Sequence, residues 1–407
     1  MLKRIDVNDL RLGMYLHALD GPWLDHPFWR NKFRLEADSD LQAMRRSGLK
    51  HCWIDSAKGL DVAVAVAVAP PPAAGVVDLA APAERPRAPA ATSFEDELQH
   101  AAQLCRKARG AVRQLFAELR MGKALNAEAM QPLVEELTAS VFRNPGALVS
   151  LARLKTKDDY TYMHSVAVCA LMVALARELG FDVAACREAG LAGLLHDVGK
   201  AMMPLDVLTK PGKLTEAEFA VMRAHPERGH ALLIEGGSAG SAALDVCLHH
   251  HERVDGKGYP HRLVGAAIGP LARMGAICDV YDAISSARPY KSAWDPAESL
   301  SRMASWEGHF DPPMFASFVR SLGIYPTGSL VRLRSGRLAV VVKQHAKDLI
   351  APTVKAFFST RSNLPTAVTR LDLSRPDAGD VILRREPRDA WNFPHLETLW
   401  AGDAAPR

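Results

Sequence analysis

Short apolar-polar alternations with a period of two open the chain. They lie at Lys3–Val7, Met14–Leu16 and His51–Ile54, and apolar residues with helical spacing lie at Asp38–Ser47. A period of two predicts half-buried strands, and apolar positions three and four residues apart predict an amphipathic helix. We therefore expect residues 1–60 to form a small α+β module.

Both patterns disappear in residues 61–91. This segment holds a Val-Ala alternation over Val62–Ala69, followed by a tract rich in proline that starts at Pro70. Such a composition buries too little apolar surface to offset the entropy that a chain loses when it becomes ordered. It predicts a linker, although the Val-Ala alternation by itself would also fit an edge strand.

Helical periodicity dominates residues 92–325. Ser93 followed by Asp96 is a capping signature for the first helix, and the helical pattern then continues with breaks at Gly and Pro residues. A region of this length with repeated amphipathic helices predicts one large helical bundle. The expected fold class of the whole chain is therefore mainly α.

The period of two returns in residues 326–407. Alternating segments at Ser329–Leu333 and Arg337–Val342 flank the dipeptide Ser335-Gly336, which indicates a hairpin. Further strand patterns lie at Thr353–Ser359, Ala367–Leu373 and Asp380–Leu383. We expect this part of the chain to form a short β-rich extension.

Composition excludes several classes of partner. Fifty Lys and Arg residues against 46 Asp and Glu leave a net charge of +4, too small a surplus to favour a nucleic-acid polymer or an anionic membrane. No apolar run approaches the roughly 20 residues that span a bilayer, and the first residues lack the apolar region of a signal peptide. The six cysteines are scattered without a CxxC pair, which favours reduced thiols. We expect a cytoplasmic protein with no membrane partner.

Histidines and aspartates recur in the helical region where the pattern is otherwise apolar. They are His164, His196, Asp197, His225, His249, His250, His251 and Asp279. A single histidine on an apolar helix face is more often a hydrogen-bonded core residue than a metal ligand. A whole set of such residues would require many buried polar contacts unless a metal gathered them. We therefore expect a metal cluster.

The adjacent pair His196 and Asp197 suggests two metal ions. Neighbouring residues on a helix point about 100° apart, so the two side chains need not bind one ion in the same way. The carboxylate of Asp197 has two oxygens and can bridge two ions, while the imidazole binds one. Mixed nitrogen and oxygen ligands suit divalent first-row ions such as iron or manganese, without choosing among them.

Two further residues are placed three positions after candidate ligands. Asp282 follows Asp279 on the same helix face, where it either orients a ligand from behind or lies solvated at the helix end. Lys200 follows Asp197 and either meets a phosphate or leaving oxygen beside the metals or lies on the surface. Spacing alone leaves both alternatives open.

Four ordered motifs resemble the HD-GYP subclass of HD-superfamily phosphohydrolases. They are Leu-His-Asp-Val-Gly-Lys at Leu195–Lys200, Lys-Pro-Gly-Lys-Leu-Thr at Lys210–Thr215, His225-Pro226, and the segment His250–Pro260 that contains Gly-Tyr-Pro. The resemblance runs from about residue 159 to residue 312. Residues 1–60 also resemble the small N-terminal module that precedes many HD-GYP domains.

The resemblance implies a bacterial signalling enzyme that hydrolyses cyclic di-GMP, with pGpG or GMP as the end product. Its chemistry would be in-line attack by a metal-bridging hydroxide, with Asp197 and Lys200 as catalytic residues. The implied metal ligands are His164, His196, Asp197, His225, His250, His251 and Asp279. Tyr160 stands where members with three metals have a glutamate, so the resemblance implies two. His249 lies outside the motif as a neighbour.

The resemblance also implies how the substrate is held. Lys200, Arg288 and Lys291 would contact its phosphates, and Tyr259 would be available for stacking. The loop Gly256–Pro260 would dock diguanylate cyclase (GGDEF) domains, and its alternative role is a structural turn.

Two other functions compete with this one. A different HD phosphohydrolase would act on nucleotides or phosphomonoesters, and a panel of substrates would distinguish it. A catalytically silent HD-GYP module would bind cyclic di-GMP or a GGDEF partner without turnover. The complete ligand set argues against the silent module, because loss of activity commonly shows in the His-Asp or His-His positions.

Overall fold

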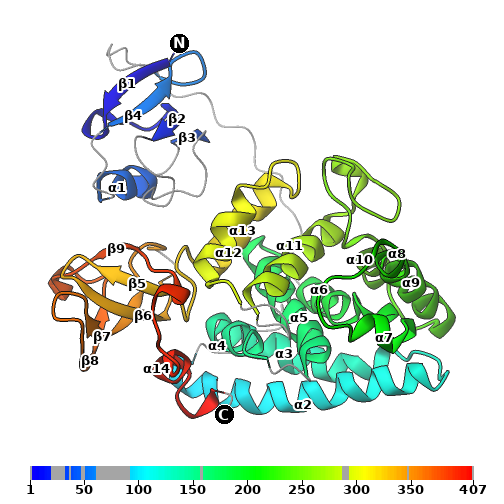
Figure 1. The fold of residues 1–407 in the computed structure, drawn as a ribbon. Coiled ribbons are helices and arrows are strands. Elements are labelled where there is room, and N and C mark those ends of the chain that lie inside the picture. Colours follow the sequence, from blue (N-terminus) through cyan, green and yellow to red (C-terminus); the bar gives the residue numbers. More distant parts are fainter. Residues whose placement is uncertain are drawn as a thin grey trace, which may run out of the picture. The chain divides into compact units, whose positions relative to one another are not determined.

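The computed structural model describes residues 2–19, 33–35, 38–46, 51–60, 92–155, 159–286, 293–345 and 348–405. The chain divides into two compact units, Met1–Arg87 and Ala88–Arg407. The segment 61–91, for which the sequence predicts a linker, lies outside the described residues. Figure 1 shows a small unit of strands with one helix and a large unit dominated by helices, in agreement with the predicted fold class.

The first unit is built on a four-stranded antiparallel sheet. Its strands are β1 (Leu2–Asp6), β2 (Tyr15–Leu19), β3 (Phe33–Arg34) and β4 (His51–Asp55), in the order β1-β4-β2-β3, with helix α1 at Asp38–Arg46 and the 3-10 turn η1 at Val7–Asp9. Alternate residues of the sheet join α1 in a common core that includes Met14, Leu16, Met44 and Ile54. The predicted strands and helix are confirmed.

The second unit begins with a bundle of helices. In chain order these are α2 (Phe94–Arg120), α3 (Gln131–Arg143), α4 (Pro145–Ala152), α5 (Tyr160–Glu178), α6 (Val183–Leu195), α7 (Leu205–Leu208), α8 (Glu216–Met222), α9 (His225–Gly236), α10 (Ser241–His249), α11 (Pro270–Ser285), α12 (Pro296–Ala304) and α13 (Pro312–Leu322). Short 3-10 turns lie between them at η3 (Glu128–Met130), η4 (Val198–Met202) and η5 (Gly265–Ala267). The predicted cap of α2 is confirmed, since the Ser93 hydroxyl accepts a hydrogen bond from the Asp96 backbone N–H at 3.1 Å.

Helix α5 forms the centre of the bundle. It packs against α6 and α11, and every residue from Met163 to Ala176 is buried. Its 19 residues are long and apolar enough to cross a membrane, so the expectation that no apolar run approaches that length is corrected. Because 78% of its apolar window is buried inside the protein, its composition is that of a core helix.

The chain ends in a five-stranded antiparallel sheet in the order β8-β7-β6-β5-β9. Its strands are β5 (Leu330–Leu333), β6 (Arg337–Lys343), β7 (Thr353–Ser359), β8 (Leu364–Asp372) and β9 (Ile382–Arg385). The predicted strands and the hairpin are confirmed, and Gly336 makes the turn with a φ of 85°, which glycine adopts without strain. Four short elements have no counterpart in the sequence pattern: η6 (Pro376–Ala378) between β8 and β9, and η7 (Arg388–Ala390), α14 (Leu396–Ala401) and η8 (Gly402–Ala404) after β9.

Asp295 ties this sheet to the helices. One of its carboxylate oxygens caps α12 by accepting the Ala297 backbone N–H at 2.9 Å, and the other accepts the Leu330 backbone N–H of β5 at 3.2 Å. The side chain is buried, so both bonds form away from water, where an unpaired polar group would be costly. The β-rich extension is thus joined to the bundle by a buried carboxylate.

Candidate metal centre

The structure brings together all seven metal ligands that the sequence predicts. His164 lies in the buried helix α5, and His196 and Asp197 lie where α6 ends and η4 begins. His225 is the first residue of α9, His250 and His251 follow α10, and Asp279 lies within α11. Five segments of the bundle therefore direct imidazoles and carboxylates at one point, which is how helical bundles build metal sites.

Gly199 explains why α9 comes so close to Asp197. A Cβ at Gly199 would lie 1.9 Å from the backbone oxygen of His225 and 2.6 Å from the backbone nitrogen of Gly229. Only a residue without a side chain permits this contact between η4 and α9. The glycine of the Leu195–Lys200 motif thus sets the distance between Asp197 and His225.

The two oxygens of Asp197 face different histidines. Its Oδ2 lies 3.4 Å from Nε2 of His164 and 3.3 Å from Nε2 of His196. Its Oδ1 lies 3.1 Å from Nε2 of His225 and 3.7 Å from Nε2 of His250. A carboxylate that points one oxygen at each of two imidazole pairs has the geometry of a bridging ligand.

Asp279 completes the enclosure from α11. Its Oδ1 lies 2.9 Å from Nε2 of His164 and 3.9 Å from Nε2 of His196, and its Oδ2 lies 3.6 Å from Nδ1 of His251. Three overlapping sets of side chains place their ligand atoms within 4.8 Å of one another. They are His164 with His196 and Asp279, His225 with His250 and His251, and His196 with Asp197 and His250.

Backbone carbonyls determine the tautomer of three of these histidines. Nδ1 of His196 lies 2.8 Å from the Gly193 oxygen, Nδ1 of His225 lies 2.8 Å from the Met222 oxygen, and Nδ1 of His250 lies 3.0 Å from the Val246 oxygen. A carbonyl can only accept, so each Nδ1 carries a proton and each neutral ring presents the lone pair of Nε2 to the centre.

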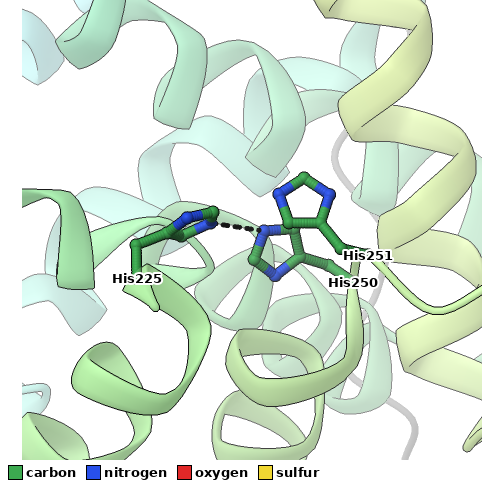
Figure 2. Close-up of side chains that lie close together, drawn as sticks. All are labelled: His225, His250 and His251. Atoms are coloured by element: carbon green, nitrogen blue, oxygen red, sulfur yellow. Dashed lines mark hydrogen bonds between the residues drawn. The ribbon is translucent and has the colours of Figure 1, made fainter. Parts of the chain in front are cut away.

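Figure 2 shows the consequence for His225 and His250, whose Nε2 atoms face each other at 3.2 Å. Two neutral rings with protonated Nδ1 atoms would place two lone pairs in contact there. Among the described residues, Nε2 of His196 and Oδ1 of Asp197 are also buried without a hydrogen-bond partner. Divalent cations fit this donor set, because they would satisfy the lone pairs that the protein leaves unpaired.

The charge states of the centre also suit cations. Although burial acts to raise it, Lys200 and His196 hold the pKa of Asp197 well below its ordinary value. Burial lowers the pKa of His251 to about 3 and, together with neighbouring imidazoles, that of His250 far below its usual range. An ionised carboxylate and neutral imidazoles are the forms that bind metals.

His164 differs from the other histidines because carboxylates surround it. Burial alone would lower its pKa, but hydrogen bonds to Asp197, Asp279 and Asp282 raise the pKa of His164 to about 10. The side chain therefore carries a proton on each nitrogen when no cation is bound. Metal binding at Nε2 would release one of these protons.

Asp282 orients His164 from behind. Its Oδ2 accepts a hydrogen bond from Nδ1 of His164 at 2.6 Å, and its side chain is only 1% exposed. The alternative of a solvated carboxylate at the helix end is therefore wrong. The same carboxylate pairs with the fully buried Lys155 and accepts a hydrogen bond from the Ser286 hydroxyl at 3.1 Å. Lys155 was missed in the sequence, because a lysine outside any periodic pattern gives no sign of burial.

The loop that follows His251 is held by buried contacts. Both oxygens of Glu252 accept backbone N–H groups, from His261 at 2.7 Å and from Leu263 at 3.0 Å. A Cβ at Gly258 would lie 2.4 Å from the Arg253 backbone nitrogen, so this glycine is needed for the loop to fold back on itself.

Tyr259 lies beside the centre. Its ring centroid is 4.7 Å from that of His251, and the guanidinium carbon of Arg223 lies 4.7 Å from the same ring. The tyrosine thus packs against a predicted ligand, and Arg223 is a cation near the centre that the sequence did not reveal.

The structure also places three further residues that the sequence analysis singled out, and two others lie outside its described part. Lys200 pairs with Oδ2 of Asp197 and is 21% exposed, so it lies between the centre and solvent. Both ring nitrogens of His249 are engaged elsewhere, with Asp245 at 2.7 Å and His261 at 3.1 Å, in agreement with its being a neighbour. Tyr160 stacks on His164 with 5.8 Å between ring centroids. Arg288 and Lys291 lie outside the described residues.

Comparisons with known proteins show which families and relatives the chain resembles. A family described as an HD domain matches residues 139–314, and a domain of unknown function, DUF3391, matches residues 2–130. The chain is 53% identical over 403 residues to the cyclic di-GMP phosphodiesterase PA4108 of Pseudomonas aeruginosa, a match that covers 99% of this chain and 96% of the relative.

Two shorter matches fall on other phosphodiesterases. Over 150 residues the chain is 44% identical to the cyclic di-GMP phosphodiesterase response regulator RpfG of Xanthomonas campestris, covering 36% of this chain and 39% of that protein. Over 168 residues it is 38% identical to the 3'3'-cGAMP-specific phosphodiesterase 1 of Vibrio cholerae, covering 40% of this chain and 38% of that protein.

Proposed function

The chain belongs to the HD-GYP family of HD-domain phosphohydrolases, and we propose that it is a metal-dependent phosphodiesterase that hydrolyses cyclic di-GMP. The relative that matches nearly its whole length carries that activity in its name, whereas the relative named for cGAMP matches well under half of this chain. Cyclic di-GMP is therefore the first substrate to assay.

The geometry of Asp197 supports a centre of two divalent ions. One ion would be held by His164, His196, Asp279 and Oδ2 of Asp197, and the other by His225, His250, His251 and Oδ1 of Asp197. Tyr160 offers no carboxylate at the start of α5 for a third ion. The mixed nitrogen and oxygen ligands suit iron or manganese.

Bound divalent ions would supply a water molecule of lowered pKa and would stabilise negative charge on the phosphoryl oxygens. The protein residues would bind the diester and stabilise the charge that develops on it. Lys200 would direct its ammonium group at the charge that develops on the phosphoryl group or the departing ribose oxygen. Arg288 and Lys291 would hold the other phosphate of the dinucleotide. In-line hydrolysis of one diester gives pGpG, and hydrolysis of the second gives GMP.

The Gly256–Pro260 loop would have two roles. Tyr259 packs on His251 and would keep that ligand in place, with a guanine base as a further stacking partner. Lys257 at the tip is 77% exposed and would be available to a GGDEF-domain partner. A cytoplasmic location is consistent with the six free cysteines, five of which are buried.

A direct assay tests this function. The full-length protein, loaded anaerobically with iron or manganese, is incubated separately with cyclic di-GMP and with 3'3'-cGAMP, and the products are separated by chromatography. We expect pGpG or GMP from cyclic di-GMP at a higher kcat/KM than for the mixed dinucleotide. Tight binding of cyclic di-GMP without any product would instead establish a silent receptor.

A further inference from the structure

A cavity outside the candidate metal centre lies between the helices and the C-terminal sheet. It has a volume of about 540 Å³ and is lined by residues of α2, α3, α4, α5, α11, α13 and the end of β6. None of the seven predicted ligands lines it. Cavities of this size accommodate small metabolites.

The wall of this cavity is strongly basic. Five of its lining residues are cations, namely Arg143, Arg153, Arg177, Arg320 and Lys343, whereas the lining acid is Glu178. Two of the cations are already paired, because Arg320 donates to Glu178 at 2.8 Å and Arg143 donates to Glu97 at 2.6 Å. Three cations therefore remain without a carboxylate within 4 Å in the described part of the chain, so the wall attracts anions.

Arg153 is the most buried of these cations. It is only 8% exposed, and the hydrogen bond that the described residues offer its guanidinium is one to the Thr327 backbone oxygen at 3.1 Å. A guanidinium carries a full positive charge, and burying that charge costs free energy even though Asp295 and Glu397 lie near enough to act to raise the pKa of Arg153. Burial outweighs them and lowers the pKa of Arg153. A bound anion would offset that cost.

The other two unpaired cations lie at the edges of the cavity. Lys343 is exposed at the end of β6. Arg177 donates to the carbonyl oxygens of Val141 and Phe142 at 3.1 and 3.2 Å, and its guanidinium carbon lies 5.2 Å from the Phe142 ring. Backbone carbonyls leave its full positive charge uncompensated, so Arg177 adds to the field that Arg153 and Lys343 produce.

We propose that this cavity binds a small phosphate monoester with a flat apolar body. A carboxylate would neutralise one of the three unpaired cations, whereas a phosphate monoester carries a charge of about −1.5 to −2 at neutral pH and can accept from two guanidinium groups. The apolar body is matched by Phe94, Phe142 and Leu322, which line the same space. This site is independent of the metal centre and of the proposed phosphodiesterase activity.

The two sites nevertheless share helices. Tyr281 lines the cavity two residues after Asp279 on α11, and Arg177 lies on α5, which also carries His164. An anion in the cavity would thus contact the same two helices that position metal ligands.

Titration calorimetry on the full-length protein tests the site with three probes: inorganic phosphate, phenylphosphonate and uncharged phenol. We expect phenylphosphonate to bind more tightly than phosphate, and phenol to bind without measurable affinity. Lys343→Glu places a negative charge at the cavity and should weaken phenylphosphonate binding by about tenfold or more. Arg334→Glu makes the same charge change at an exposed position in the turn after β5, outside the cavity, and should leave binding unchanged.

The pair of variants separates this cavity from the metal centre. A phosphonate held by the metal ions would bind equally well to both variants, and that result would overturn the proposal. Failure of both phosphate and phenylphosphonate to bind the wild-type protein at millimolar concentration would overturn it as well. Because Lys343 is exposed, its substitution leaves the core intact, and unchanged melting temperatures for both variants verify this.

Discussion

Asp282 accepts a hydrogen bond from Nδ1 of His164 at 2.6 Å while it pairs with the buried ammonium group of Lys155. The carboxylate thus fixes the orientation of one predicted metal ligand through a contact on the side away from the centre. Such partners of ligating histidines typically matter almost as much as the ligands themselves. The relation makes Asp282 a positioning residue.

Replacing Asp282 with Asn should weaken metal binding without abolishing it. The amide still offers an acceptor to His164 but loses the charge that raises its basicity, so we expect metal affinity to fall by roughly 10–100-fold. Competition with a chelator measures this affinity. At saturating metal the KM for cyclic di-GMP should stay near the wild-type value, whereas a purely structural role would lower stability and leave metal affinity unchanged in the folded fraction.

A double variant separates the two effects. Asp282→Asn leaves Lys155 buried with less compensation for its charge, which destabilises the protein. Adding Lys155→Met should restore part of the melting temperature but not the metal affinity. Recovery of both would show that charge balance, and not orientation of His164, is the function of Asp282.

The sequence predicted the cluster of candidate ligands and offered Asp282 as a residue that orients one of them, but it did not predict the cations that contact this cluster from outside. Ligands such as His225 and Asp279 interrupt apolar helical patterns, and the cost of burying a polar side chain makes such interruptions conspicuous. Lys155 and Arg223 belong to no apolar-polar pattern that would predict whether they are buried. Only the packed structure shows that Lys155 pairs with Asp282 and that Arg223 lies over the ring of Tyr259. Partners chosen by tertiary packing leave little trace in local sequence.

The same distinction holds for the fold. Periods of two and of 3.6 predicted the helical bundle and every strand of both sheets except β3, because those patterns reflect which face of an element is buried. The joint at Asp295 was not predicted, since capping α12 and bonding the β5 backbone depend on two segments that lie 35 residues apart. The short helix α14 has only six residues, too few for a period to be recognised.

Replacing Asp197 with Ala should remove metal and turnover together. The substitution deletes the carboxylate whose two oxygens face His164 with His196 and His225 with His250, so each of the two proposed ions would lose a ligand. We expect hydrolysis of cyclic di-GMP to fall by orders of magnitude, without rescue by more substrate. Elemental analysis and steady-state kinetics on the same preparation measure both quantities.

Asp206→Ala is the matched control. This aspartate is exposed in α7, nine residues after Asp197, and its loss should change neither metal content nor turnover. If Asp197→Ala retained two ions per chain and lost only activity, its role as a bridging ligand would be wrong.

Replacing Gly199 with Ala should damage the centre through the backbone. The new Cβ would lie 1.9 Å from the His225 oxygen, so η4 and α9 must move apart and separate Asp197 from His225. We expect a loss of stability of about 1–3 kcal/mol, the range for overpacking, together with reduced metal content. Thermal unfolding and elemental analysis give the two readouts.

Gly110→Ala serves as its control. Gly110 is exposed within α2, and a Cβ there meets nothing within 4 Å, so the substitution should raise helix stability by up to about 1 kcal/mol. If Gly199→Ala and Gly110→Ala had the same stability and metal content, the contact between η4 and α9 would not be what makes Gly199 necessary.

A chain that starts at Thr92 should fold and keep its metals. The second compact unit contains every predicted ligand, and the Thr92 side chain already bonds within it, to Glu97 at 3.1 Å. Its metal content should match that of the full-length protein, and its melting temperature should match that of the helical unit within the full-length protein. Insolubility or metal loss, under conditions where the full chain behaves well, would show that the bundle needs the residues before Thr92.

Replacing Arg288 and Lys291 with Ala should separate recognition from chemistry. Both residues lie outside the described part of the chain, so this prediction rests on their place in the sequence motif. The changes remove positive charge directed at the substrate and leave the ligand set intact. Metal content should therefore stay near the wild-type value while the KM for cyclic di-GMP rises, each lost charged contact costing roughly 1.5–3 kcal/mol.

Asp197→Ala should lose both metal and turnover, whereas the Arg288 and Lys291 variants should keep their metal and show only a raised KM. If the Arg288 and Lys291 variants lost metal, these two residues would help to form the metal centre and would not act in substrate recognition alone. Arg334→Ala, which removes an exposed arginine from the turn after β5, should change neither quantity. If the wild-type protein binds cyclic di-GMP tightly and never hydrolyses it, these variants would weaken binding alone. The phosphodiesterase assignment would then give way to that of a receptor, because the basic pair would still recognise the ligand at a centre without turnover.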